Sequence, residues 1–98
     1  FTVSWNAIPG ATRYDMVYGA LESLRSTSGD YQLSTVTCLF NDHDGLDWAL
    51  GGDPGPGEGL WLLVRGENCG GSGTYDTGSP GQIGSRDSEI AASGNGCP

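Results

Sequence analysis

The stretch VSWNAIPGATRYDMVYG, residues 3–19, decides the fold class of this chain. Apolar and polar side chains alternate up to Trp5, which is the period-2 pattern of a half-buried strand. Pro9-Gly10 is a turn signal, and the alternation resumes after it. The apolar positions of the second alternation are Tyr14, Met16 and Tyr18. The segment therefore predicts two strands that pair as a hairpin across this turn.

Four later runs of β-branched, aromatic and aliphatic residues predict further strands. They are YQLSTVTCLF (31–40), DGLDWAL (44–50), LWLLVRGENC (60–69) and SGTYDTG (72–78). The segment GALESLRSTSGD (19–30) is too short and too rich in Ser and Gly to predict more than a turn, so it is expected to be a loop. The 18 Gly and 5 Pro interrupt the chain every few residues, which disfavours long helices.

These patterns predict an all-β protein with one two-sheet antiparallel sandwich over residues 1–78. An irregular tail is expected over residues 79–98, because no periodicity continues there. The expected core consists of the apolar side chains on the inward faces of the strands: Trp5, Tyr14, Met16, Leu46, Trp48, Leu62 and Val64.

The charge balance narrows the range of partners. Twelve acidic residues against four basic ones give a formal charge of −8, so nucleic acid is not expected to bind. An anionic membrane surface is disfavoured for the same reason, and no apolar run is long enough for membrane insertion.

Three cysteines in a small chain indicate an oxidising compartment, and hence a secreted, extracellular or cell-surface protein. Beyond Ile83 and Ile90 the tail has almost no apolar anchor, so we expect a disulfide between Cys69 and Cys97 to hold it in place. Cys38 would then be left over as a small buried hydrophobic residue.

No motif predicts an enzyme. His43 is the only histidine, it lies in the acidic turn NDHDG, and no nucleophile motif accompanies it, so a solvated loop histidine is expected.

Two kinds of binding site remain open on the sequence alone. The acidic side chains of FNDHDGLD provide oxygen ligands suited to calcium, although the EF-hand register fails and a plain acidic turn is the alternative. The candidate calcium ligands are Asp42, Asp44 and Asp47, together with Asn41, and with Asp53 and Asp76 as further candidates. Trp61 either stacks on a carbohydrate or packs beneath the C-terminal tail.

The stretches VSWNAIPGATRYDMVYG and LWLLVRGENCGGSGTYD together resemble a fibronectin type III domain. NCGGSGTYD with a terminal CP is similar to a variant found in secreted bacterial multidomain proteins. The resemblance covers residues 1–78 and implies an immunoglobulin-like sandwich without implying any activity. Leu60 stands where the family usually has its corner tyrosine. The chain also begins on the family's strand B, with no recognisable strand A before it.

A missing strand A leaves an unpaired sheet edge beside FTVSW, which contains neither charge nor Pro. The residues of this expected interface edge are Phe1, Thr2, Val3, Ser4 and Trp5. Our hypothesis is that an extended segment of another protein subunit, preferably a second copy, fills the edge and builds an extracellular filament. The donor would be residues 81–92 or a segment preceding Phe1, and excision of strand A is the alternative explanation.

The predicted function is therefore that of a secreted structural or adhesive module. The alternative is a carbohydrate-binding or spacer domain of a secreted enzyme.

Overall fold

The computed structural model describes residues 2–50, 58–77, 82 and 84–98, and its strands form two antiparallel sheets. The larger sheet has the strand order β3-β2-β5-β6, and the smaller one pairs β1 with β4. The prediction of a hairpin over residues 3–19 was therefore wrong, because β1 and β2 lie in different sheets. The strands are β1 Thr2–Ser4, β2 Arg13–Ala20, β3 Thr35–His43, β4 Asp47–Ala49, β5 Leu60–Asn68 and β6 Gly71–Ser72. The helices are α1 Leu21–Ser26, α2 Tyr31–Ser34 and α3 Arg86–Ala92.

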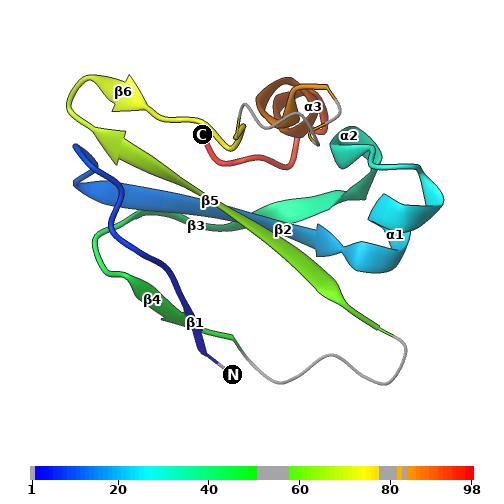
Figure 1. Ribbon diagram of the computed structural model, residues 1–98, viewed down its shortest axis with the longest axis horizontal. Helices are drawn as coiled ribbons and strands as arrows, with labels where there is room; N and C mark the ends of the chain where they lie inside the picture. Colours follow the sequence, from blue (N-terminus) through cyan, green and yellow to red (C-terminus); the bar gives the residue numbers. More distant parts are fainter. Residues whose placement is uncertain (1, 51–57, 78–81, 83) are drawn as a thin grey trace.

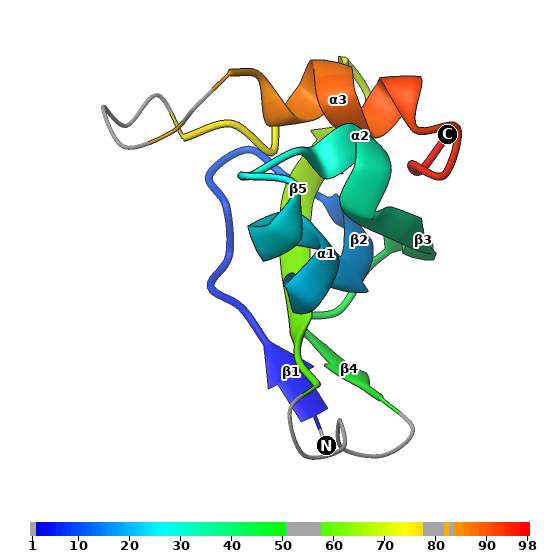
Figure 2. The ribbon, with the colours of Figure 1, turned by 90° about the vertical axis from the view of Figure 1, so that its right-hand side faces the viewer.

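The elements form three layers (Figures 1 and 2). The four-stranded sheet lies in the middle, with the β1–β4 pair against one face and α2, α3 and the C-terminal segment against the other. The expected small β-sandwich is therefore present, with a helical layer added to it.

The prediction of a loop for residues 19–30 was wrong, because α1 begins at Leu21. Leu21 and Leu24 pack against the core on the helical side, which stabilises a helix too short to persist alone. Asp30 then caps α2 by accepting hydrogen bonds from the backbone N–H groups of Gln32 and Leu33, at 2.8 and 3.2 Å.

The two faces of the four-stranded sheet carry separate apolar clusters. Between the two sheets lie the buried residues Tyr14, Met16 and Phe40, with Val3, Trp5, Ala11, Leu39, Trp48, Leu62 and Val64 packed around them. The prediction of this core is confirmed except for Leu46, which precedes β4 at the end of the smaller sheet and is 43 % exposed.

The second cluster lies beneath the helices and consists of Val17, Trp61, Tyr75 and Ile90. Trp61 is 7 % exposed, and its ring centroid lies 5.0 Å from that of Tyr31. The alternative that Trp61 packs beneath the C-terminal segment is therefore the correct one, and Trp61 offers no platform for a carbohydrate.

The prediction of an irregular tail was wrong for residues 86–92, which form α3. Ser85 caps the helix, and Ile90 inserts into the core with 2 % exposure. Asp87 accepts hydrogen bonds from the Thr74 hydroxyl and from the Tyr75 backbone N–H, the latter at 2.8 Å. The helix is thus held by apolar burial and by a carboxylate, where a disulfide from Cys69 was expected.

The predicted disulfide between Cys69 and Cys97 was also wrong, because Cys97 is bonded to Cys38 and Cys69 is exposed. Cys38 is paired with Val17 in the sheet, so both side chains face the helical layer. The C-terminal segment crosses this face, where the Asn95 side-chain amide donates to the Thr35 carbonyl at 3.1 Å. Its path leads to β3 and not to the β5–β6 turn that carries Cys69.

Candidate functional site

The structure brings Asp42 together with Asp15 and Glu67, and not with Asp44 and Asp47. Within the described ranges, the Asp15, Asp42 and Glu67 carboxylates form the one group of three or more metal-binding side chains whose ligand atoms lie within 4.8 Å of one another. Asp53 lies outside the described residues. Asp76 serves the α3 region by accepting a hydrogen bond from the Arg86 backbone N–H at 2.6 Å.

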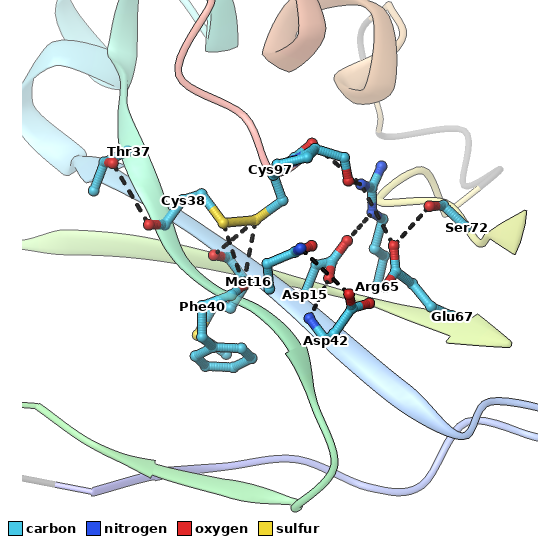
Figure 3. The surroundings of a disulfide bond; sticks show 12 residues. Asp15, Met16, Thr37, Cys38, Phe40, Asp42, Arg65, Glu67, Ser72 and Cys97 are labelled. Atoms are coloured by element: carbon cyan, nitrogen blue, oxygen red, sulfur yellow. Dashed lines mark hydrogen bonds and ion pairs between the residues drawn. A yellow bond between two sulfur atoms is a disulfide. The ribbon is translucent and has the colours of Figure 1, made fainter.

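The three carboxylates come from neighbouring strands at one end of the four-stranded sheet (Figure 3). Asp15 on β2 is fully buried, and its Oδ2 accepts a hydrogen bond from Arg65 Nε at 2.8 Å. Its Oδ1 accepts from the Asp42 backbone N–H at 3.0 Å. Because the register of β2 and β5 pairs Asp15 with Arg65, the Arg65 guanidinium compensates the buried negative charge of Asp15.

Glu67 completes the group from β5. Ser72 donates to Glu67 Oε1 at 2.7 Å, and Arg65 Nη2 lies 3.9 Å from the same oxygen. A hydrogen bond with Asp42, assisted by burial and by Asp15, raises the pKa of Glu67 to about 7. Three carboxylates that face one guanidinium therefore retain a proton up to near-neutral pH.

Arg65 also connects this group to the C-terminal segment. Its Nη2 donates to the Cys97 and Pro98 carbonyls, both at 3.4 Å, and its guanidinium lies 5.0 Å from the centroid of the Tyr75 ring. The side chain therefore joins the end of the sheet to the segment that carries the disulfide.

This arrangement does not fit calcium. Calcium takes six to eight oxygen ligands, whereas this group offers three carboxylates and Arg65 already supplies the positive charge opposite Asp15. The group is better suited to holding the strand ends and the C-terminal segment together. The sequence did not reveal it, because Asp15 and Arg65 lie 50 positions apart.

His43 is a packing residue and not a solvated loop residue. Its ring centroid lies 5.0 Å from Phe40, 5.2 Å from Trp48 and 6.1 Å from Trp5. Its Nε2 lies 2.9 Å from the Asp47 carbonyl oxygen, at hydrogen-bonding distance. The ring therefore helps to join the two sheets.

A cavity of about 360 Å³ lies at the same end of the molecule, between the turn at Ile8–Ala11 and the β5–β6 hairpin. Asn68 joins its two walls by donating to the Gly10 carbonyl at 3.1 Å and accepting from the Gly70 N–H at 2.7 Å. No aromatic side chain lines this cavity, so among its described walls there is no platform for stacking a sugar ring.

The outer edge of β1 is the second candidate site. The Trp5 N–H donates to the Leu46 carbonyl at 3.0 Å, which makes Trp5 and Leu46 a hydrogen-bonded pair. Because such pairs alternate along an antiparallel ladder, the backbone groups of Thr2 and Ser4 face away from β4. Within the described part of the chain no strand lies on that side. Phe1, the first residue of the expected edge, lies outside the described residues.

No protein-family model matches the chain, and neither a curated protein nor a solved structure was found that is similar to it. None of the helices in the described ranges has the length and apolar character needed to cross a membrane. The fold and its sites thus define a small β-rich protein with two antiparallel sheets and one disulfide.

Proposed function

We propose that this chain is a secreted structural or adhesive module that joins a second protein subunit by accepting an extended segment at the outer edge of β1. The observation that carries the proposal is the open backbone edge at Thr2 and Ser4. The chain from Thr2 to Trp5 has no charge and no Pro, which are the usual devices that protect an edge from pairing.

The strand arrangement supports a fibronectin type III-like sandwich for this module. Its order β3-β2-β5-β6 opposite β1–β4 is compatible with an immunoglobulin-like fold, in which strands C, F and G share one sheet and B and E lie in the other. In that correspondence β1 is strand B, and its outer edge is the place of strand A.

The disulfide supports secretion. The Cys38–Cys97 bond is of a kind that persists in oxidising compartments.

The segment at residues 81–92 is not a free donor in this structure, because α3 begins at Arg86 and Ile90 is 2 % exposed in the chain's own core. The donor is therefore a different extended segment. If each subunit both donates and accepts, the contact is head-to-tail and builds an open filament.

Ser4→Pro tests the proposal, with Ser4→Ala as the matched control. Proline removes the outward N–H of Ser4 and leaves the hydrogen bonds between β1 and β4 in place. We expect purified wild type and Ser4→Ala to form assemblies that grow with concentration in sedimentation velocity, and Ser4→Pro to remain monomeric. Equal behaviour of all three proteins would contradict the proposed function.

A further inference from the structure

The C-terminal segment contains an asparagine, Asn95, that is followed by a glycine. The other three asparagines, Asn6, Asn41 and Asn68, precede residues that carry a side chain. The backbone nitrogen that follows an asparagine can attack the side-chain carbonyl carbon and close a five-membered ring, and a Cβ on the following residue hinders this approach. Asn95 is therefore the asparagine of this chain whose amide is most open to the reaction.

The fold leaves both reacting groups accessible. Asn95 is exposed, and its side-chain amide donates a hydrogen bond to the Thr35 carbonyl at 3.1 Å. Within the described residues the Gly96 N–H makes no hydrogen bond, so its nitrogen has no partner to leave before it attacks. An alanine Cβ at position 96 would lie 3.0 Å from Ile90 Cγ2 in the core. Packing against Ile90 thus favours the glycine that leaves Asn95 unprotected.

We propose that Asn95-Gly96 is a site of spontaneous deamidation, and that this modification loosens the C-terminal segment from β3. The Gly96 nitrogen forms a bond to Asn95 Cγ, and the side-chain nitrogen leaves as ammonia with the proton of the Gly96 N–H. Water then opens the ring at either carbonyl, which gives aspartate or an isoaspartate with one more carbon in the main chain. The reaction consumes water, releases ammonia and needs no oxidant or second protein.

The products change the contact that holds the segment to β3. The Asn95 amide donates to the Thr35 carbonyl, whereas a carboxylate has no proton to donate and places a negative charge against that oxygen. Isoaspartate also lengthens the main chain between α3 and Cys97, whose sulfur is bonded to Cys38 on β3 (Figure 3). Both products therefore weaken the hold on the segment, while the disulfide keeps it attached.

Tryptic mapping of the folded protein, incubated at mildly alkaline pH and then reduced, tests the site. Cleavage after the four arginines places each of the four asparagines in a different peptide. We expect a mass increase of about 1 Da in the peptide of residues 87–98, about tenfold or more faster than in the peptides of the other asparagines. Asn95→Gln, whose side chain is too long to close a five-membered ring, should leave this peptide unchanged. Similar rates in all four asparagine-containing peptides, or an unchanged peptide 87–98 in the wild type, would overturn the proposed site.

Asn95→Asp tests the consequence, because it carries the aspartate product in every molecule. We expect its melting temperature to lie about 4–8 °C below that of the wild type, as the loss of one hydrogen bond predicts. Asn6→Asp is the charge-matched control, since it adds the same charge at an exposed residue outside the C-terminal segment, and its effect should be smaller. Equal melting temperatures of the two variants would overturn the proposed loosening.

Discussion

Removal of the Cys38–Cys97 bond is expected to be the most destabilising cysteine change in this chain. The bond joins residues 59 positions apart, and for a loop of this length the chain-entropy model gives about 4 kcal/mol of stabilisation. A domain of this size is stable by only about 5–15 kcal/mol, so the loss is a large share of the total. Burial of Ile90 and the hydrogen bond from Asn95 to Thr35 still hold the C-terminal segment in place.

The experiment begins with Cys69→Ser, which prevents a freed Cys97 from finding another partner. This exposed residue forms no bond in the structure, and its replacement is expected to change stability by less than about 0.5 kcal/mol. Cys38→Ala in that background is then expected to lower the free energy of unfolding in urea by about 3–4 kcal/mol. Peptide mapping of the wild type without reduction should recover residues 38 and 97 in one linked fragment. A large loss in Cys69→Ser alone, or a loss below about 1 kcal/mol on removing Cys38, would refute the pairing.

Three other substitutions test the acidic group, the packing of α2 against the sheet, and the hydrogen bonds that hold α3. Because the pKa of Glu67 is raised in the folded protein, the protonated carboxyl contributes to the free energy of unfolding. This contribution is complete below about pH 4.5 and is lost as the pH rises through 7. We therefore expect Glu67→Gln to abolish this decline in stability with pH. At pH 8 its free energy of unfolding in urea should exceed that of the wild type by about 1–2 kcal/mol after allowance for solvent screening. An unchanged pH profile would contradict this role of Glu67. Gly19→Ala is expected to lower the free energy of unfolding by about 2–3 kcal/mol, because the alanine Cβ would overlap the Ser34 carbonyl oxygen and lie 2.6 Å from the Trp61 ring. A wild-type melting temperature would show that α2 can shift without loss of stability. Asp76→Asn is expected to lower the free energy of unfolding by about 1–2 kcal/mol and to speed amide exchange in α3. The reason is that burial raises the pKa of the Asp76 carboxylate but its hydrogen bonds, among them that from the Arg86 N–H, outweigh burial and lower it. Wild-type exchange rates would argue against a role of Asp76 in holding α3.

Most strands were predictable because their signal is local, but residues 31–34 form α2, and residues 73–77 follow β6 without extending it. Alternation around Tyr14 and Met16 sets the two faces of β2, and Pro9-Gly10 marks the preceding turn, so neighbouring residues suffice. The short helices were missed because their stability comes from distant partners, as when Ile90 fills the core beneath α3. Asp30 before α2 and Ser85 before α3 were capping signals that favoured helices.

The acidic group was not predictable in the same way. Asp15 alternates with the apolar positions of β2, so the sequence pattern alone predicts an exposed side chain, and its buried partner depends on the register with β5. Asp42 was identified as a candidate ligand, but it was grouped with its sequence neighbours and not with residues from other strands. The disulfide was mispaired because the path of the chain after α3 decides which cysteine meets Cys97.

The disulfide also determines how the module responds when it is pulled from its two ends. Tension applied after Cys97 passes through the sulfur–sulfur bond to Cys38, so the 58 residues between them carry no load. Only the part of the chain before Cys38 can then unravel, to a contour of about 130 Å at ~3.5 Å per residue, against about 340 Å for the whole chain. A module tethered at both ends in a flowing or shearing medium would thus lengthen by a short, fixed step and keep β5, β6 and α3 within a covalently closed loop.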